Sequence, residues 1–472
     1  MTNAKEMARN YSVQFGGRIF GTFLGVLTIA ILTRHLGETG YGELTTAMTF
    51  LQMFGVMVDF GLTLTLVQMI STVGANEEKI VGNVLALRLL SGIVFFGLAA
   101  AIGFALPYTL AIKITIAVGT LSYLFMTASS MLVGIFQKHM AIWRFALAEV
   151  INRFITLGVI VLFAYLAFGV VAMMIAFVLG NLIQLITTVY LAGPYVRVRP
   201  QIDLLVWKDA VVRSWPIGLS IFFNLVYLKS DILFLGWFRS QAEVGLYGAA
   251  YKILDVITSL PVMYMGLALP SLVHAWTSNN KIEFKKIMQR SFDFFSIIAW
   301  PILVGSLVVG VPLLTLVSGE AFAISGEVLR ILILAAVAVF FGSLTGHAVV
   351  ALGLQKPMTL GYAATAVLAV IGYILVIPEY GLWGAAWITV AAEVLIATLT
   401  FIVVSRTSRW LPDLSILTKV LLSCAVMYLV LIWLPAMNVL IQILIGSIVY
   451  GLVLFATGGV HLSTIKEMIK RD

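Results

Sequence analysis

Residues Ile19–Leu32 have the sequence IFGTFLGVLTIAIL, an apolar run that is followed directly by Thr33-Arg34-His35. A helix needs about 20 apolar residues to cross the hydrocarbon core of a bilayer, and this run with its flanks is long enough. No small-x-small cleavage site follows it, as a removable signal peptide would require. We therefore expect this stretch to be a membrane-spanning helix, the first of a series.

The composition extends this expectation to the whole chain. The 472 residues are 61% hydrophobic and only 11% charged, whereas a soluble domain carries about 25% charged residues. A water-soluble core cannot enclose so much apolar surface. The single cysteine, Cys424, excludes a disulfide scaffold, and the scarcity of charge excludes a nucleic-acid-binding chain. The sequence predicts an all-α polytopic membrane protein.

Windows of about 20 apolar residues divide the chain into fourteen transmembrane helices. The connections between them are short, and the longest runs from Gly193 to Ser214. The predicted spans are centred near Leu27, Val56, Phe95, Leu121, Val159, Phe177, Asn224, Thr258, Val304, Val339, Val367, Val390, Met427 and Val449.

The loop charges predict an orientation. With the N-terminus in the cytoplasm, nearly all loop Lys and Arg lie on the cytoplasmic side, and the outer loops hold only Arg34 and Arg239. Both termini of this multi-pass cell-membrane protein are therefore expected in the cytoplasm. The net charge of +8 then faces anionic membrane lipids and needs no nucleic acid partner. The amphipathic stretches Ile202–Arg213 and Leu462–Arg471 are expected to lie on the cytoplasmic interface.

Three short motifs recur in the same order at a nearly constant offset of 205 to 218 residues. They are Gly40-Tyr41-Gly42 and Gly245-Leu246-Tyr247-Gly248, then Phe136–Met140 and Leu354–Met358, then Phe168-Gly169-Val170 and Tyr380-Gly381-Leu382. Spans 1–6 therefore correspond to spans 7–12. Because six is even, the two repeats share one orientation, as in transporters whose halves enclose a cleft.

This duplication predicts three parts of the chain. Residues 1–200 form an N-terminal lobe with spans 1–6, and residues 201–408 form a C-terminal lobe with spans 7–12. Residues 409–472 add two more spans and a cytoplasmic tail. Two pseudo-symmetric lobes around a cleft suggest transport by alternating access.

The run Arg34–Leu44, RHLGETGYGEL, followed by Asp59-Phe60-Gly61-Leu62, resembles the signature of the polysaccharide transporter (Wzx-like) family. Gly381–Ala386, GLWGAA, is similar to the second-half motif of that family. The resemblance covers essentially the whole chain. It implies the fold of the superfamily that also holds MATE exporters and lipid II flippases, with two lobes in a V. It also implies a flippase that moves undecaprenyl- or dolichyl-linked oligosaccharide to the outer leaflet.

Ionisable residues within membrane spans are costly and mark functional sites by default. Lys229 and Asp231 lie in the predicted span 7, and Lys252 and Asp255 in span 8, all at a similar expected depth. One interpretation is two ion pairs that join these spans. The other is a pair of cavity cations that bind a pyrophosphate and its sugar, with acids available for ion coupling.

Three other charged positions leave alternatives open. Arg18, beside the first-span glycines, resembles the cavity-lining arginines of lipid II flippases, but its side chain could also reach the cytoplasmic headgroups. Arg153 is a further substrate candidate, although Glu149 four residues earlier suggests a structural pair. Asp59 could titrate or bind a cation, or it could pair with a base on another span. Arg88 is expected to extend toward the cytoplasmic surface.

These residues define the leading hypothesis, a lipid-linked oligosaccharide flippase. Arg18, Lys229, Lys252 and Arg153 would bind the anionic head while the lipid tail stays among membrane lipids. Asp59, Asp231 and Asp255 would couple transport to Na⁺, H⁺ or the membrane potential. The alternative is a cation-coupled small-molecule exporter of the MATE type, which the lack of an acid in span 1 disfavours.

The sequence also disfavours an enzyme. The five histidines show no metal-ligand spacing, and no loop could hold a catalytic domain. Glycine-rich phosphate cradles are missing from the sequence, so we expect neither a cofactor nor direct use of ATP. A polytopic glycosyltransferase or polymer ligase, the third class, would need a large outer loop.

Overall fold

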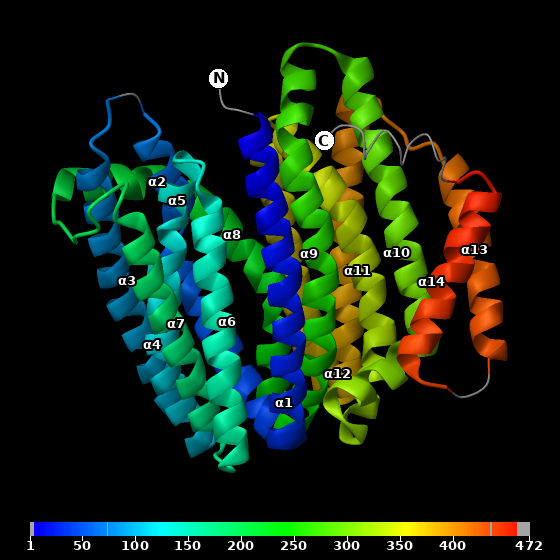
Figure 1. The fold of residues 1–472 in the computed structure, drawn as a ribbon, viewed down its shortest axis with the longest axis horizontal. Coiled ribbons are helices and arrows are strands. Elements are labelled where there is room, and N and C mark those ends of the chain that lie inside the picture. Colours follow the sequence, from blue (N-terminus) through cyan, green and yellow to red (C-terminus); the bar gives the residue numbers. More distant parts are fainter. Residues whose placement is uncertain (1–3, 73, 435–436, 460–472) are drawn as a thin grey trace. The chain divides into compact units, whose positions relative to one another are not determined.

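The computed structural model describes residues 4–72, 74–434 and 437–459 (Figure 1). Nothing is described of the side chains of residues 4–19, nor of those at positions 216, 217, 220, 224, 227 and 228. Within the described residues every regular element is helical. The elements are α1 (Ala4–Asp59), α2 (Leu62–Ile70), α3 (Glu77–Ala105), α4 (Leu110–Met131), α5 (Val133–Lys138), α6 (Ile142–Tyr165), α7 (Val170–Ala192), α8 (Leu204–Phe238), α9 (Gln241–Thr277), α10 (Lys281–Ser318), the 3₁₀ turn η1 (Glu320–Phe322), α11 (Ala323–Ala351), α12 (Gln355–Ser408), α13 (Ser415–Trp433) and α14 (Val439–Ala456).

The predicted all-α membrane fold is confirmed. Among the described residues, eleven helices are long and apolar enough to cross a membrane. Two of them, α1 and α12, each contain a backbone break that separates two predicted spans, at Gly37 (φ 65°) and at Gly381 (φ 55°). Every predicted span centre lies in a helix. The count of fourteen stays a prediction, because α8 is not among the eleven.

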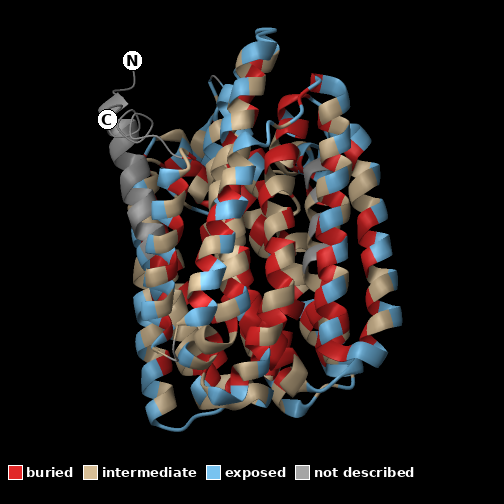
Figure 2. Ribbon diagram, turned by 90° about the vertical axis from the view of Figure 1, so that its right-hand side faces the viewer, coloured by how far each residue is buried: buried red, intermediate tan, exposed pale blue. Residues whose placement is uncertain are grey.

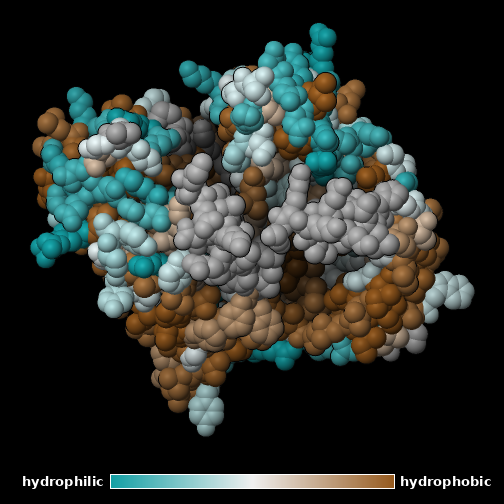
Figure 3. Space-filling view, turned by 45° about the horizontal axis from the view of Figure 1, so that its top comes forward, coloured by the Kyte–Doolittle hydropathy of each residue, from teal (hydrophilic) through white to brown (hydrophobic). Residues whose placement is uncertain are grey.

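The helices bury one face and expose another, and the exposed face is apolar. Figure 2 shows buried and exposed residues alternating along individual helices. On α3 the exposed residues include Leu90, Ile93 and Val94, with Ile93 63% exposed. Hydrophilic side chains gather instead at the ends of the helices that are tilted toward the viewer in Figure 3, and apolar side chains cover the flanks below them. This arrangement suits helices whose flanks contact lipid and whose ends contact water.

The chain forms two compact units, Met1–Gly245 and Leu246–Asp472. In the first unit, α1 packs against α4 and α6, and α7 packs against both of those helices. In the second unit, α10, α11 and α12 pack in succession, and the hairpin of α13 and α14 packs on α10 (Figure 1). The predicted three-part division at residues 200 and 408 stays a prediction.

The two units share local features that support the predicted duplication. In the first unit, Ser129 of α4 and Thr188 of α7 hydrogen-bond through their hydroxyls at 3.0 Å. In the second unit, Thr345 of α11 and Thr400 of α12 do the same at 2.7 Å. The second pair follows the first by 216 residues (129 to 345) and by 212 residues (188 to 400). The same two helices of each repeat are therefore joined by the same kind of bond.

One predicted interfacial segment is described and the other is not. Within Ile202–Arg213, the residues from Leu204 onward form the beginning of α8 rather than a separate helix, because α8 continues without interruption from Leu204 to Phe238. Leu204 and Leu205 at its start are 72% and 80% exposed. Its place on the membrane interface stays a prediction. Leu462–Arg471 lies outside the described residues.

Candidate functional site

The second predicted span is broken inside its apolar run. The long helix α1 ends at Asp59, and α2 begins at Leu62. Between them Phe60 and Gly61 have positive φ angles of 35° and 82°. A break of this kind leaves backbone groups without helical partners, and membrane proteins tolerate it only where it is buried in protein or lines a cavity. The apolar run alone predicts a span without this break.

Asp59, at this break, is paired with a base from another span. Its Oδ1 accepts hydrogen bonds from the Thr63 hydroxyl at 2.6 Å and from the Thr63 amide at 3.3 Å, in the first turn of α2. The same oxygen accepts a hydrogen bond from Arg88 Nη1 of α3. Arg88 is only 2% exposed, and Asp59 is 25% exposed. The expectation that Arg88 extends to the cytoplasmic surface is wrong, because the carboxylate holds its guanidinium inside the unit.

This arrangement favours one of the two interpretations of Asp59. A buried guanidinium is strongly destabilising unless a partner compensates its charge. Asp59 supplies that charge, bonds the first turn of α2 and connects α1 to α3. The pairing interpretation therefore describes Asp59 in this state, and its role in ion coupling stays a prediction.

Arg153 of α6 contacts the first span directly. Its Nη1 donates to the Gly21 carbonyl at 2.7 Å, and its Nη2 donates to Glu149 Oε1 at 2.9 Å. The predicted Glu149–Arg153 pair is therefore confirmed. A Cβ built on Gly21 would lie 2.9 Å from Arg153 Nε, and one on Gly25 would lie 3.2 Å from Nη1. These glycines thus leave room for a guanidinium rather than for another helix backbone.

Arg153 keeps 36% of its side chain exposed, so its guanidinium is positioned without being enclosed. Arg18 lies one turn before Gly21 on α1, and its side chain is outside the described residues. A guanidinium with free donors suits a phosphate or pyrophosphate.

The other predicted site residues are divided between the units. Lys229 and Asp231 lie in α8 of the first unit, where Asp231 is fully buried. Lys252 and Asp255 lie in α9 of the second unit, 4.0 Å apart and 44% and 40% exposed. The wide, exposed contact between these last two side chains is weaker than a closed ion pair. A common site for all four residues stays a prediction.

A polar network inside the first unit was missed from the sequence. Asn152 Nδ2 of α6 donates to Asn181 Oδ1 at 3.0 Å and to Gln184 Oε1 at 2.5 Å, both on α7. Asn181 in turn donates to Ser122 of α4 at 2.8 Å, and Thr156 donates to Asn152 at 2.8 Å. Amide side chains in apolar segments were the available signal, because each one needs a partner at membrane depth. The network joins three helices.

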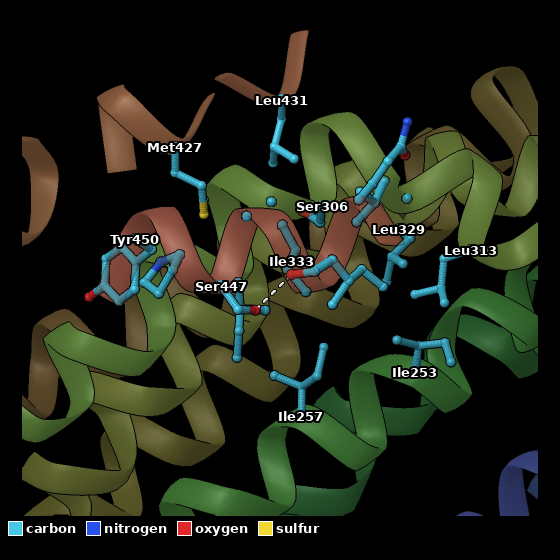
Figure 4. Close-up of a pocket in the computed structure, with 18 of the residues that line it drawn as sticks. Ile253, Ile257, Ser306, Leu313, Leu329, Ile333, Met427, Leu431, Ser447 and Tyr450 are labelled. Carbon is cyan, nitrogen blue, oxygen red and sulfur yellow. Dashed lines mark hydrogen bonds between the residues drawn. The ribbon is translucent and has the colours of Figure 1, made fainter. Parts of the chain in front are cut away.

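A cavity of about 440 Å³ lies in the second unit among α9, α10, α11, α13 and α14 (Figure 4). Aliphatic side chains such as Ile257, Ile333 and Leu431 line most of it. Gln442 Oε1 is buried at this cavity and has no hydrogen-bond partner among the described residues. Ser447, also in the lining, donates to the Ile443 carbonyl at 2.8 Å. The cavity suits an apolar chain with few polar groups.

The fold is that of known membrane transporters. A solved structure of the lipid II flippase MurJ, in an inward closed conformation, is similar with a TM-score of 0.78 and 15% identity, over 93% of this chain and 97% of that one. An inward-facing MATE family multidrug resistance transporter of the MOP superfamily is similar with a TM-score of 0.67 and 16% identity, over 82% of this chain and 94% of that one. The chain thus has the fold of this class of multi-pass membrane transporters.

The sequence specifies the family within that class. A model described as polysaccharide biosynthesis protein matches residues 7–276, and the chain belongs to that family. A probable flippase, AglR of Haloferax volcanii, is 25% identical over 211 residues. That match spans 44% of this chain and 44% of the relative's length. These relatives are transporters rather than enzymes, in agreement with the prediction.

Proposed function

We propose that the protein flips a polyprenyl-pyrophosphate-linked oligosaccharide from the inner to the outer leaflet by alternating access. The observation that carries the proposal is Arg153, a partly exposed guanidinium held between Gly21 and Glu149 in a chain of the polysaccharide biosynthesis protein family. Glu149 compensates part of the cost of this charge, and the 36% of the Arg153 side chain that stays exposed lets an anionic ligand reach the guanidinium as well. The name of the partial relative, a probable flippase, supports the same activity.

The head of the substrate would be bound by cations. Arginine binds phosphate oxygens in a bidentate manner, and lysine provides a point charge. Arg153 and Lys252 are partly exposed, and Arg18 and Lys229 complete the proposed set. The apolar cavity in the second unit has room for several units of a prenyl chain.

The energy would come from an ion gradient or from the membrane potential. Asp231 and Asp255 are the proposed acids for coupling to Na⁺ or H⁺, and Asp59 joins them only in a state in which Arg88 no longer holds it. A charge that crosses the membrane potential gains about 2.3 kcal/mol per 100 mV. Binding of a cation by an acid beside a lysine would change the local charge that the pyrophosphate meets.

The test is a flipping assay with the purified protein in vesicles that contain lipid-linked oligosaccharide. The fraction of substrate accessible to a membrane-impermeant glycosidase is followed over time. We expect Arg153→Ala and Lys252→Ala to abolish flipping, and Lys356→Ala, at the start of α12, to leave it unchanged. Normal flipping by both Arg153→Ala and Lys252→Ala would contradict the assignment. Efflux of small cations without any flipping would instead favour a MATE-type exporter.

A further inference from the structure

The polar network of the first unit is built around Asn152, the residue that directly precedes Arg153 on α6. The Asn152 side chain donates to Asn181 and Gln184 of α7 at 3.0 and 2.5 Å. It also accepts a hydrogen bond at 2.8 Å from the hydroxyl of Thr156, one turn further along α6. Consecutive residues of an α-helix point about 100° apart. While Asn152 is held against α7, Arg153 is therefore turned away from α7.

Two contacts with α1 show where this rotation places Arg153. Its Nη1 donates to the Gly21 carbonyl at 2.7 Å, and the rings of Phe20 and Phe154 lie with their centroids 5.6 Å apart. Phe20 precedes Gly21 and Phe154 follows Arg153, so the ring contact lies beside the guanidinium. A rotation of α6 about its own axis would change both contacts at once.

Apolar packing does little to fix the rotation of α6. Of its 24 residues, all of them described, only Ala148, Thr156 and Ile160 are buried, whereas α4 buries ten of 22. Its exposed flank includes aliphatic residues such as Leu147 and Leu162. Because lipid tails are as apolar as leucine, an aliphatic flank gives no preference for one rotation over another. Hydrogen bonds between helices are directional, so the network supplies that preference.

Gly180 of α7 brings the network into close contact with α6. A Cβ at this position would lie 1.9 Å from the Thr156 hydroxyl oxygen and 2.3 Å from Asn152 Oδ1. Any side chain here would displace these two α6 members of the network. On the other side of α7, Asn181 donates to Ser122 of α4 at 2.8 Å. The amides that hold α6 are therefore themselves held by a third helix.

We propose that Asn152, Asn181 and Gln184 are positioning residues for Arg153, which fix the rotation of α6 and so aim the guanidinium at the anionic head of the substrate. The inference rests on the proposed function, because that function assigns the head to Arg153. Asn181 and Gln184 are 9% and 6% exposed, so they act through Arg153 and not on the head itself. Loss of the network should weaken binding of the head more than it slows the later steps of flipping.

The rotation is measured first, without any substrate. In a Cys424→Ala background, Phe20→Cys and Phe154→Cys are joined by a short bifunctional thiol reagent, and the rate of cross-linking reports how α6 faces α1. We expect Asn152→Leu and Gly180→Ala each to lower this rate about fivefold or more, because the first removes the central amide and the second displaces it.

Two variants of the same helices are the matched controls. Thr188→Val breaks the hydrogen bond between Ser129 of α4 and Thr188 of α7, which does not involve α6. Gly158→Ala adds a methyl group to α6 where a Cβ would meet nothing within 4 Å. Both should leave the cross-linking rate unchanged.

Flipping rates at several substrate densities then separate positioning from stability. We expect Asn152→Leu to raise KM about fivefold or more while kcat stays within about twofold, because binding of the head is what is lost. The combined variant Asn152→Leu, Asn181→Leu and Gln184→Leu leaves no amide of the network buried without a partner, so it should recover stability. Its KM should nevertheless stay raised, because nothing then fixes the rotation of α6.

The cross-linking rate decides the inference independently of transport. An unchanged rate in folded Asn152→Leu and Gly180→Ala would overturn it, whatever the flipping assay shows. A normal KM in the combined variant would also overturn it, because the network would then serve stability alone. A lowered rate confined to Asn152→Leu and Gly180→Ala would support the positioning of Arg153 even if the wild-type protein fails to flip oligosaccharide, and that failure would count against the proposed function alone. If Asn152→Leu does not fold, Gly180→Ala tests the same point with every polar group retained.

Discussion

Arg88 of α3 donates its Nη1 hydrogen bond to Asp59 at the end of α1, at the point where the second predicted span breaks. The two residues are 29 positions apart in the sequence. Arg88 is almost fully buried, and Asp59 also bonds the first turn of α2 through Thr63. One carboxylate thus compensates a buried charge and joins three helices.

Removing either charge should destabilise the first unit. We expect Asp59→Asn and Arg88→Met each to lower the free energy of unfolding by about 3–5 kcal/mol, because each leaves the other charge or its hydrogen bonds without a partner. The double variant should be less destabilised than the sum of the two single ones. Denaturant unfolding in detergent measures all three. Additive losses would show that the two side chains do not act as a pair.

The variant Asp59→Asn also tests the proposed role of Asp59 in ion coupling. If Asp59 binds the coupling ion, Asp59→Asn should abolish the dependence of flipping on the ion gradient in the fraction of protein that remains folded. If its role is structural, that fraction should flip with an unchanged gradient dependence.

The hydropathy of the sequence predicted the helices because a bilayer imposes them: every backbone group in lipid must bond within its own helix. The Glu149–Arg153 pair was also predictable, because four residues place two side chains on one helix face. The break at Phe60 and Gly61 was not, since α2 continues the apolar run of α1. The partnership of Asp59 and Arg88 depends on packing between segments that are distant in the sequence, and no local pattern encodes it.

The rate of flipping should be sensitive even to a conservative substitution of Arg153. We expect Arg153→Lys to reduce flipping at least about tenfold although it keeps the charge, because the single nitrogen of lysine cannot bind Gly21 and Glu149 and also offer a phosphate a bidentate pair of donors. Glu149→Gln is the matched control, which keeps a hydrogen-bond acceptor and should have a smaller effect. Initial flipping rates at several substrate densities give the comparison. Equal rates for Arg153→Lys and wild type would show that charge alone matters at this position.

The repeated hydroxyl pairs should have equal and modest energies. Interhelical hydrogen bonds in membrane proteins contribute about 0.6 kcal/mol on average. We therefore expect Thr188→Val in the first unit and Thr400→Val in the second to cost similar small amounts. Double-mutant cycles with Ser129→Ala and Thr345→Val isolate each bond. A strongly unequal coupling energy would argue that the two pairs serve different purposes despite their matching positions.

Gln442 offers a test of the cavity in the second unit. Its Oε1 is buried without a hydrogen-bond partner among the described residues, and such an atom costs about 1–3 kcal/mol. Gln442→Leu is close in volume and should raise the melting temperature of the empty protein. If the cavity binds a purely apolar prenyl segment, the variant should flip substrate at least as fast as wild type. A stabilised variant with impaired flipping would show that Gln442 bonds a polar group of the substrate. Ser447→Ala is the control, because the Ser447 hydroxyl already bonds the Ile443 carbonyl of its own helix and its loss should change neither property much.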